Sequence, residues 1–320
     1  MQLQIPNLNI ISLPENILLV HQVKTPHYFS CCDGLIIMPM EGRNEQTIVV
    51  DLNIEPVLID KLYPYIAPVS MYICSHGHMD HITHVHKWES LDAQIFAPEP
   101  EHSYLLDLAN FYTGYGFDQA LSFETIEQFA KVNMFKPCIN INSFKPGHKF
   151  QYNNLHIETI PFLGHSKAHV GFLIPRERIL HISCLGYDLV FPGSQGFGPW
   201  YGFKECSLDQ YLEDISKAEQ IFLNQSDVLT SSHSNIVKYP DTTPFTYMRN
   251  KIQSNQEKVN QAIRSLNIKD FSTQSLQELL KLDLFFPKRK IKGFMKEIYN
   301  FWESGIIEKH FKKQDNAIEY

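Results

Sequence analysis

In its first third the chain reads Ile73-Cys74-Ser75-His76-Gly77-His78-Met79-Asp80-His81. Ahead of these polar residues lies a short, largely apolar run from Val69, which has the character of a buried strand. In an extended chain residues i and i+2 point the same way, so His76 and His78 can bind one ion, while Asp80 and His81 face a second position. Imidazole and carboxylate suit zinc, and also iron or manganese. The stretch therefore predicts a metal site on the turn that leaves the strand.

Length and composition allow one large domain, or a large domain with an appendage. The chain has 320 residues, of which 43% are hydrophobic, and this is ample for a core. Its formal charge of −7 is unevenly spread. Residues 241–320 hold 14 Lys+Arg against 10 Asp+Glu, whereas residues 1–240 hold 14 against 25, a charge of −11. An acidic main body disfavours a nucleic-acid partner.

Targeting signals are not evident. The first 20 residues lack the basic start and apolar run of a signal peptide, and no segment reaches the roughly 18 apolar residues of a membrane span. The cysteines show neither zinc-finger nor secreted-disulfide spacing, which indicates reduced thiols. These six residues are Cys31, Cys32, Cys74, Cys138, Cys184 and Cys206. We therefore expect a cytoplasmic protein without a membrane partner.

The His-x-His-x-Asp-His pattern resembles the signature of the metallo-β-lactamase superfamily, and three later segments match that superfamily in order and spacing. Gly164-His165-Ser166 follows a strand-like run and places His165 at a ligand position. The apolar run from Arg178 ends in Ser183-Cys184, where the family usually has Gly-Asp. A further apolar run ends in Ser232-His233-Ser234, where the family usually has Gly-His-Gly.

The resemblance implies a metal-ligand set. The first metal takes His76, His78 and His165. The second takes Asp80, His81 and His233, together with either Cys184 or Asp188. Cys184 is favoured because it directly ends the apolar strand and because thiolate is a good zinc ligand. Asp188, four residues later, is the alternative. Two divalent cations are thus expected, with zinc favoured over iron or manganese.

Several neighbouring residues depart from the family pattern or have more than one interpretation. Asp51-Leu52-Asn53 stands where the family has Asp-x-Gly, so the turn must differ, and Asp51 is expected to support the site without binding metal. His84 and His86 are interpreted as ordinary residues near the site. The aromatic residues of 101–140 indicate either a helical pair packed on the core or a lid over an apolar pocket.

Residues 241–320 predict a helical appendage. Apolar residues from Met248 to Leu266 mark one helix, and Ser275-x-x-Glu278 resembles a capping box that opens a second. A third helical pattern starts at Ile291, and Gly305 can end it. Lys288-Arg289-Lys290 is expected to be a solvated loop. The sequence thus predicts two regions, 1–240 and 241–320.

The resemblance implies an α+β fold, the four-layer αβ/βα sandwich with metals at one edge, and this fold does not fix the reaction. We expect an enzyme that hydrolyses a carbonyl ester, thioester or lactone of small-molecule size. Two metals can hold a shared hydroxide, which Asp80 would orient as the catalytic residue. Tyr201 and His169 are candidates for the leaving-group acid. The alternative functions are an iron-dependent oxygenase and a ribonuclease or phosphodiesterase. The sequence does not decide whether the protein forms a homo-oligomer.

Overall fold

The computed structural model describes residues 4–14, 16–26, 29–39, 46–66, 68–152, 155–187, 198–233 and 236–318, with side chains as far as residue 311. Asp188, the alternative ligand of the second metal, lies outside the described residues.

The first sheet has seven strands in the order β1 to β7. The first four strands pair antiparallel, and β4 to β7 pair parallel. The strands are β1 (Leu8–Ser12), β2 (Ile17–Gln22), β3 (Gly34–Ile37), β4 (Thr47–Val50), β5 (Val69–Ile73), β6 (Gln94–Pro98) and β7 (Ile141–Phe144). Because β4 and β5 are parallel, both end at the same edge of the sheet.

The second sheet has six strands in the order β13-β12-β11-β10-β9-β8. Only β11 and β12 pair parallel, so these two also end at one edge. The strands are β8 (Lys149–Tyr152), β9 (Leu155–Pro161), β10 (Val170–Ile174), β11 (Ile179–His181), β12 (Val228–Thr230) and β13 (Val237–Lys238).

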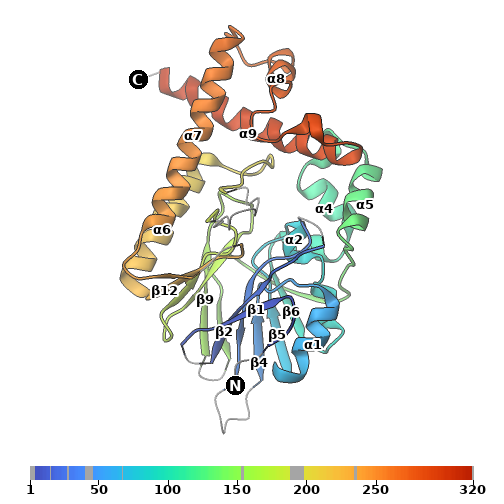
Figure 1. Ribbon diagram of the computed structural model, residues 1–320, viewed down its shortest axis with the longest axis vertical. Coiled ribbons are helices and arrows are strands. Elements are labelled where there is room, and N and C mark those ends of the chain that lie inside the picture. The colour runs from blue at the N-terminus through green and yellow to red at the C-terminus, as the bar shows by residue number, and fades with distance from the viewer. Residues whose placement is uncertain are drawn as a thin grey trace.

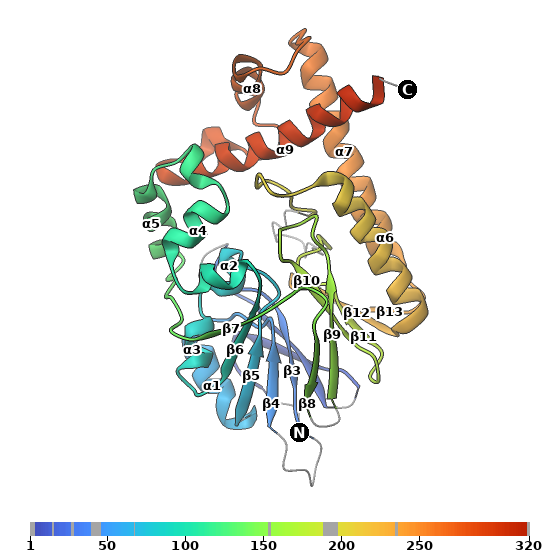
Figure 2. The same cartoon turned by 180° about the vertical axis from the view of Figure 1, so that it is seen from behind.

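The two sheets pack face to face around an apolar core, because alternate residues of each strand point to opposite faces. Ile17 and Leu19 of β2 meet Phe172 and Ile174 of β10 in this inner core. The opposite face of the first sheet is covered by α1 (Pro56–Ile66) and α3 (Val85–Glu89), and α6 (Leu208–Gln225) lies along the second sheet (Figures 1 and 2). Helix, sheet, sheet and helix are the four layers, and the predicted α+β sandwich is confirmed.

The aromatic segment after β6 forms short helices that pack on the body of the protein. They are η1 (Glu101–Leu105), α4 (Leu108–Gly114), η2 (Phe117–Gln119) and α5 (Phe123–Val132). Tyr104, Phe111, Tyr115, Phe117 and Phe129 are all buried. These side chains therefore form core, which favours the helical-pair interpretation over a lid that opens to solvent.

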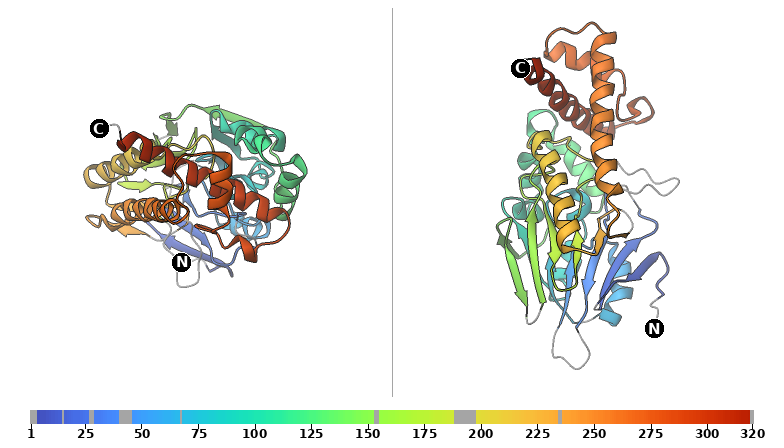
Figure 3. Two further views of the ribbon diagram at one scale, coloured as in Figure 1. Left: turned by 90° about the horizontal axis from the view of Figure 1, so that it is seen from above. Right: turned by 90° about the vertical axis from the view of Figure 1, so that its left-hand side faces the viewer.

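The C-terminal region consists of α7 (Thr243–Ser265), α8 (Thr273–Leu280), η3 (Lys288–Lys290) and α9 (Phe294–Ile318). These helices project from one end of the sandwich, where α9 crosses above α2 (Met79–Ile82) and reaches α5 (Figures 1 and 3). Among the residues described, none of the helices has the length and hydropathy that crossing a bilayer requires. The division of the chain at residue 240 stays a prediction.

Two expectations for this region were wrong, and a third was wrong in part. Gly305 does not end a helix but lies inside α9, where its missing side chain lets the helix rest against the backbone of Gly202. The capping box of α8 joins Ser272 to Ser275, one turn earlier than the sequence suggested. Of the three basic residues expected to be solvated, Arg289 and Lys290 are exposed, but Lys288 is buried, with its Nζ 3.1 Å from Oε2 of the buried Glu303.

Candidate metal centre

The potential ligands gather at one edge of the sandwich because of the strand directions. The histidine-rich motif follows the end of β5, and His78 is the N-cap of α2, which carries Asp80 and His81 on its single turn. His165 precedes β10, which runs antiparallel to β11. Cys184 follows β11, and His233 follows β12. Strand topology thus brings together segments up to 157 residues apart, the separation of residues 76 and 233.

A first group consists of His76, His78 and His165, whose ring nitrogens converge. Nε2 of His165 lies 3.2 Å from Nε2 of His76 and 3.1 Å from Nδ1 of His78. Nitrogens around a tetrahedral zinc ion at about 2.0–2.1 Å lie roughly 3.3 Å from one another. The spacing therefore fits three imidazoles on one small cation.

Burial favours the form of these imidazoles that binds metal. It lowers the pKa of His76 and of His78 well below the ordinary value, and it lowers the pKa of His165 to about 3. Only a neutral imidazole has the lone pair that a cation needs. At neutral pH all three rings are therefore ready to act as ligands.

A second group consists of Asp80, His81, Cys184 and His233. Sγ of Cys184 lies 2.9 Å from Nε2 of His81 and 3.1 Å from Nε2 of His233, and Oδ2 of Asp80 lies 3.1 Å from the same atom of His233. Cys184 also groups with His76 and His165, so its sulfur lies between the two groups. A carboxylate and a thiol beside two imidazoles form a donor set that suits a divalent cation.

The structure thus brings together all seven residues that the sequence selected as ligands. Whether each binds metal stays a prediction, as does the choice of Cys184 over Asp188. Ser183 adopts a left-handed conformation, with φ of +48°, at the turn after β11. This turn directs Cys184 into the second group.

The reactivity of Cys184 gives a test of this choice. Burial raises the pKa of each of the other five thiols, so these should react slowly with iodoacetamide. We expect zinc to slow the alkylation of Cys184 at least tenfold, and Cys184→Ser to lower the zinc content by up to one ion per chain. Mass spectrometry of alkylated peptides measures the alkylation rate, and elemental analysis measures the zinc content. Cys138→Ser is the matched control. If Cys184 were alkylated at the same rate with and without zinc, the result would favour Asp188 as the ligand of the second metal.

Asp51 connects the segments that carry the potential ligands. Its Oδ1 accepts a hydrogen bond from the backbone of Ser75 at 2.9 Å, and both carboxylate oxygens lie 3.0–3.1 Å from Nδ1 of His81. Its Oδ2 accepts from Ser183 at 2.8 Å and from Ser232 at 3.1 Å. Two of the serines that replace family glycines therefore use their hydroxyls to reach this carboxylate.

The same residue explains how the turn forms without the glycine of the family pattern. Asp51 itself has φ of +56°, a conformation that aspartate tolerates better than most residues. Burial raises the pKa of its carboxyl, but His81, whose Nδ1 lies 3.0 Å from Oδ2, and His181, 3.9 Å from the same oxygen, outweigh burial and hold the pKa well below the usual value. Asp51 is thus placed to orient His81, in keeping with the supporting role that the sequence suggested.

Glu101 is a supporting residue that the sequence did not reveal. One carboxylate oxygen accepts from the backbone N–H of Gly77 at 2.7 Å and from the hydroxyl of Tyr115 at 3.1 Å. The other accepts from the backbone N–H of Ala168 at 3.0 Å. Because Gly77 lies between His76 and His78, and Ala168 follows His165, this carboxylate joins the two loops of the first group. Nothing in the local sequence distinguishes it from a surface glutamate.

Cys32 is a second residue that the sequence did not single out. Its thiol donates to the carbonyl oxygen of Asp51 at 3.0 Å and lies 3.3 Å from Nδ1 of His81. His81 is therefore contacted on its outer side by Asp51 and Cys32, and on its inner side by Cys184. The adjacent pair Cys31-Cys32 looked like ordinary apolar core in the sequence.

The two candidates for a leaving-group acid are both buried. The hydroxyl of Tyr201 accepts from Asn255 at 2.8 Å and lies 2.8 Å from Nε2 of His310, so it ties the loop after residue 198 to α7 and α9. His169 is fully buried, with Nδ1 3.2 Å from the carbonyl oxygen of Phe162. The ring of His169 packs against the first group, 4.9 Å from the ring of His76 and 4.8 Å from that of His165. Tyr201 steadies Trp200, whose carbonyl oxygen lies 2.9 Å from Nδ1 of His165.

Comparison with known proteins rests on structure. No family model and no curated protein matches the sequence. A metallo-beta-lactamase family protein from Thermus thermophilus superposes with a TM-score of 0.64 at 16% identity, covering 97% of this chain and 95% of that chain. A beta-lactamase domain protein from Burkholderia ambifaria superposes with a TM-score of 0.63 at 13% identity, covering 97% of this chain and 89% of that chain.

The chain has the metallo-β-lactamase fold. A metallo-beta-lactamase from Pontibacter korlensis, with a TM-score of 0.53 at 16% identity, covers 75% of this chain and 98% of that chain. Matches that cover 97% of the chain must include most of the C-terminal helices, whereas the match to the Pontibacter protein leaves a quarter of the chain uncovered. Within this metallo-β-lactamase fold the His, Asp and Cys groups could hold divalent metal ions.

Proposed function

We propose that this chain is a metal-dependent hydrolase of a carbonyl ester, thioester or lactone, with a dinuclear centre that prefers zinc. The observation that carries the proposal is the pair of adjacent donor groups, joined by Cys184, at the edge of a metallo-β-lactamase fold. The two groups would hold two divalent cations, which would supply a hydroxide at neutral pH and stabilise the negative oxygen formed by its attack.

Exposure indicates the side from which a substrate would approach. The side chains of His76 and His81 are buried, whereas those of His233 and Asp80 are 27% and 16% exposed. The second group is therefore the more open one. We assign Asp80 the role of orienting the nucleophile, because its carboxylate lies on this open side and within 3.1 Å of His233.

The first group has an apolar neighbourhood. The ring of His78 lies 5.1 Å from Tyr115 and 4.9 Å from Phe203, and these two rings stack at 4.3 Å. Trp200 continues the aromatic series towards Trp302 of α9, with 5.1 Å between ring centroids. Tyr115 and Phe203 are buried, so these rings pack behind His78 and fix its position.

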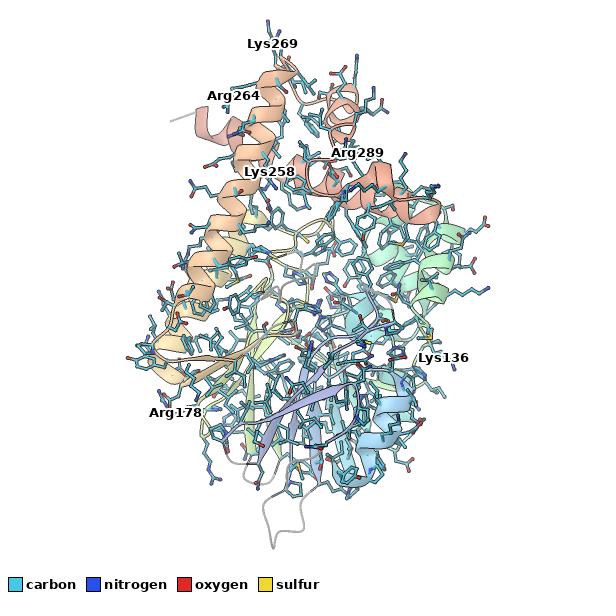
Figure 4. All side chains as sticks on the ribbon, viewed as in Figure 1. Lys136, Arg178, Lys258, Arg264, Lys269 and Arg289 are labelled. Carbon is cyan, nitrogen blue, oxygen red and sulfur yellow. The ribbon has the colours of Figure 1, made fainter. Side chains whose placement is uncertain are left out.

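The charge distribution also supports a small substrate over RNA. Binding of long polyanions depends on basic side chains that contact successive phosphates. Figure 4 shows the labelled cations Lys258, Arg264, Lys269 and Arg289 on the C-terminal helices and loops, above the sandwich that carries the two groups. Arg178 is paired with Asp227 at 2.8 Å.

A substrate screen on metal-loaded protein tests the proposal. We expect turnover of at least one lactone, alkyl ester, aryl ester or acyl thioester, loss of this activity in Asp80→Ala by at least a hundredfold, and no loss in His156→Ala, a half-exposed histidine on β9. If phosphodiesters or short RNA alone were cleaved, and Asp80→Ala abolished that cleavage, the carbonyl proposal would be wrong. Elemental analysis that found iron and little zinc would favour the oxygenase.

A further inference from the structure

Asn53 stands where the family pattern has the glycine of Asp-x-Gly, and its side chain is fully buried. A side-chain amide has two N–H groups to donate and one oxygen to accept hydrogen bonds. Nδ2 of Asn53 donates to the carbonyl oxygen of Ser30 at 3.0 Å and to the carbonyl oxygen of Asp80. Oδ1 accepts from the backbone N–H of His84 at 2.9 Å. All polar groups of this amide are therefore used, and a glycine could make none of these bonds.

Two of these bonds stand in place of a helical hydrogen bond. An α-helix joins the carbonyl oxygen of each residue to the N–H group four residues later, which for Asp80 is that of His84. The amide of Asn53 is inserted between these two groups, so each of them bonds to the side chain. Accordingly α2 ends at Ile82, and His84 is the N-cap of α3. Asn53 thus separates the turn that carries Asp80 and His81 from the next helix.

The position of α2 depends on contacts of this kind. Its four residues make a single turn, and a helix this short is not stable by itself. Its N-cap, His78, forms no side-chain capping bond. The amide of Asn53 therefore fixes the backbone of Asp80 directly. A shift of this backbone would move the carboxylate of Asp80, which lies 3.1 Å from Nε2 of His233.

The backbone of Asn53 is connected to the other ligand of α2 through Cys32. The two residues form a single antiparallel bridge, in which the N–H of Cys32 donates at 2.8 Å and the N–H of Asn53 donates at 3.2 Å. The thiol of Cys32 lies 3.3 Å from Nδ1 of His81. Asn53 therefore joins the segment that supports His81 to the helix that carries it.

We propose that Asn53 is a positioning residue that places Asp80 and His81, and that it thereby sets the affinity of the second group for its metal. This inference rests on the two-metal centre of the proposed function. Among the described residues, the hydrogen bonds of Asn53 reach the second group and its support, and none goes to the three histidines of the first group. Loss of the amide should therefore affect the second metal more than the first.

The local structure also indicates what loss of the amide would do. The carbonyl oxygen of Asp80 and the N–H group of His84 would stay unpaired, or they would bond to each other and join α2 to α3. A buried unpaired group is costly, and a joined helix changes the direction of the chain after His81. Either outcome displaces Asp80 from its place beside His233.

Zinc titration against a competing chelator tests the proposal on wild type, Asn53→Ala and Asn53→Asp. With ¹⁵N-histidine protein, the ring nitrogens of each group report which ion is bound. We expect Asn53→Ala to weaken the second ion about 10–100-fold, as is typical when a residue that orients a ligand is lost, and the first ion less than about threefold. Asn53→Asp keeps an acceptor for His84 but turns an oxygen towards the carbonyl oxygens of Ser30 and Asp80, so it should weaken the second ion at least as much.

Urea unfolding of the metal-free proteins separates positioning from simple stabilisation. The matched control is Asn133→Ala, because Asn133 is also buried and its amide donates to the carbonyl oxygen of Phe129 at 2.8 Å. Both alanine variants should be less stable than the wild type, but only Asn53→Ala should lose affinity for the second ion. If Asn53→Ala did not fold, Asn53→Ser, which keeps a hydroxyl, should show the same selective loss at smaller size. Equal weakening of both ions, or lower stability with both affinities unchanged, would overturn the proposal.

Zinc binding also separates failure of this inference from failure of the proposed function. If the wild type bound two ions but hydrolysed no ester, thioester or lactone, the hydrolase would be wrong, and a selective loss of the second ion in Asn53→Ala would still support this inference. If the wild type hydrolysed such a substrate and Asn53→Ala bound both ions as tightly, the role of Asn53 would be wrong and the hydrolase would stand. A wild type that bound no second ion would contradict both.

Discussion

Replacing His76 and His78 together with alanine should remove the metal of the first group and abolish hydrolysis. The pair supplies two of three converging nitrogens, and His165 alone, within 3.2 Å of both, cannot hold an ion by itself. We expect a loss of about one ion per chain and a fall in kcat/KM of at least 10³-fold, because metal and nucleophile are lost together. Elemental analysis after zinc loading and gel filtration gives the first number, and a steady-state assay gives the second.

The chain offers a matched control for this double variant. His84 and His86 have the same spacing and lie a few residues further along, but their rings are 6.5 Å apart and none of the described clusters of potential ligands includes them. His84→Ala/His86→Ala should therefore keep the metal content of the wild type. If it lost as much metal as the first pair, or if His76→Ala/His78→Ala kept two ions, the assignment of the first group would be wrong.

The residues that the sequence selected as ligands lie together in the structure, because their segments follow strands that end at one edge of the sandwich. A strand end is marked by a change from apolar to polar residues, and His76, His165, Cys184 and His233 all follow such a change. Parallel and antiparallel pairing then decides which ends share an edge, and the resemblance to the superfamily supplied that pairing. The local signal and the topology that the resemblance implies were together enough to select the seven residues.

Supporting residues were harder to predict because their roles depend on partners far away in the sequence. Glu101 acts on Gly77 and Ala168, which are 24 and 67 residues away, and no local pattern encodes either contact. Gly305 looked like a helix end because glycine favours that position, but close packing against Gly202 requires the same residue inside a helix. Glycine suits both a helix end and a close backbone contact inside a helix, and the sequence alone does not distinguish the two cases.

Replacing Asp51 should weaken the second group and destabilise the fold. Its carboxylate accepts from Ser75, Ser183 and Ser232 and holds Nδ1 of His81. Loss of a residue that orients a metal-binding histidine typically lowers metal affinity about 10–100-fold. Removing one partner from a buried charged network costs roughly 3–5 kcal/mol. We expect effects of this size for Asp51→Ala in a zinc titration and in urea unfolding.

Three variants at this position separate the backbone from the side chain. Asp51→Gly removes the carboxylate but relaxes the left-handed φ of +56°, so it should be roughly 1–2 kcal/mol more stable than Asp51→Ala. Asp51→Asn tolerates the same backbone and keeps one acceptor oxygen, yet it replaces the other with an N–H group that faces the Ser183 or Ser232 hydroxyl or His81. It should therefore bind zinc more weakly than the wild type although its backbone is not strained. If all three variants kept the zinc affinity of the wild type, Asp51 would support only the turn, and His81 would need no carboxylate to orient it.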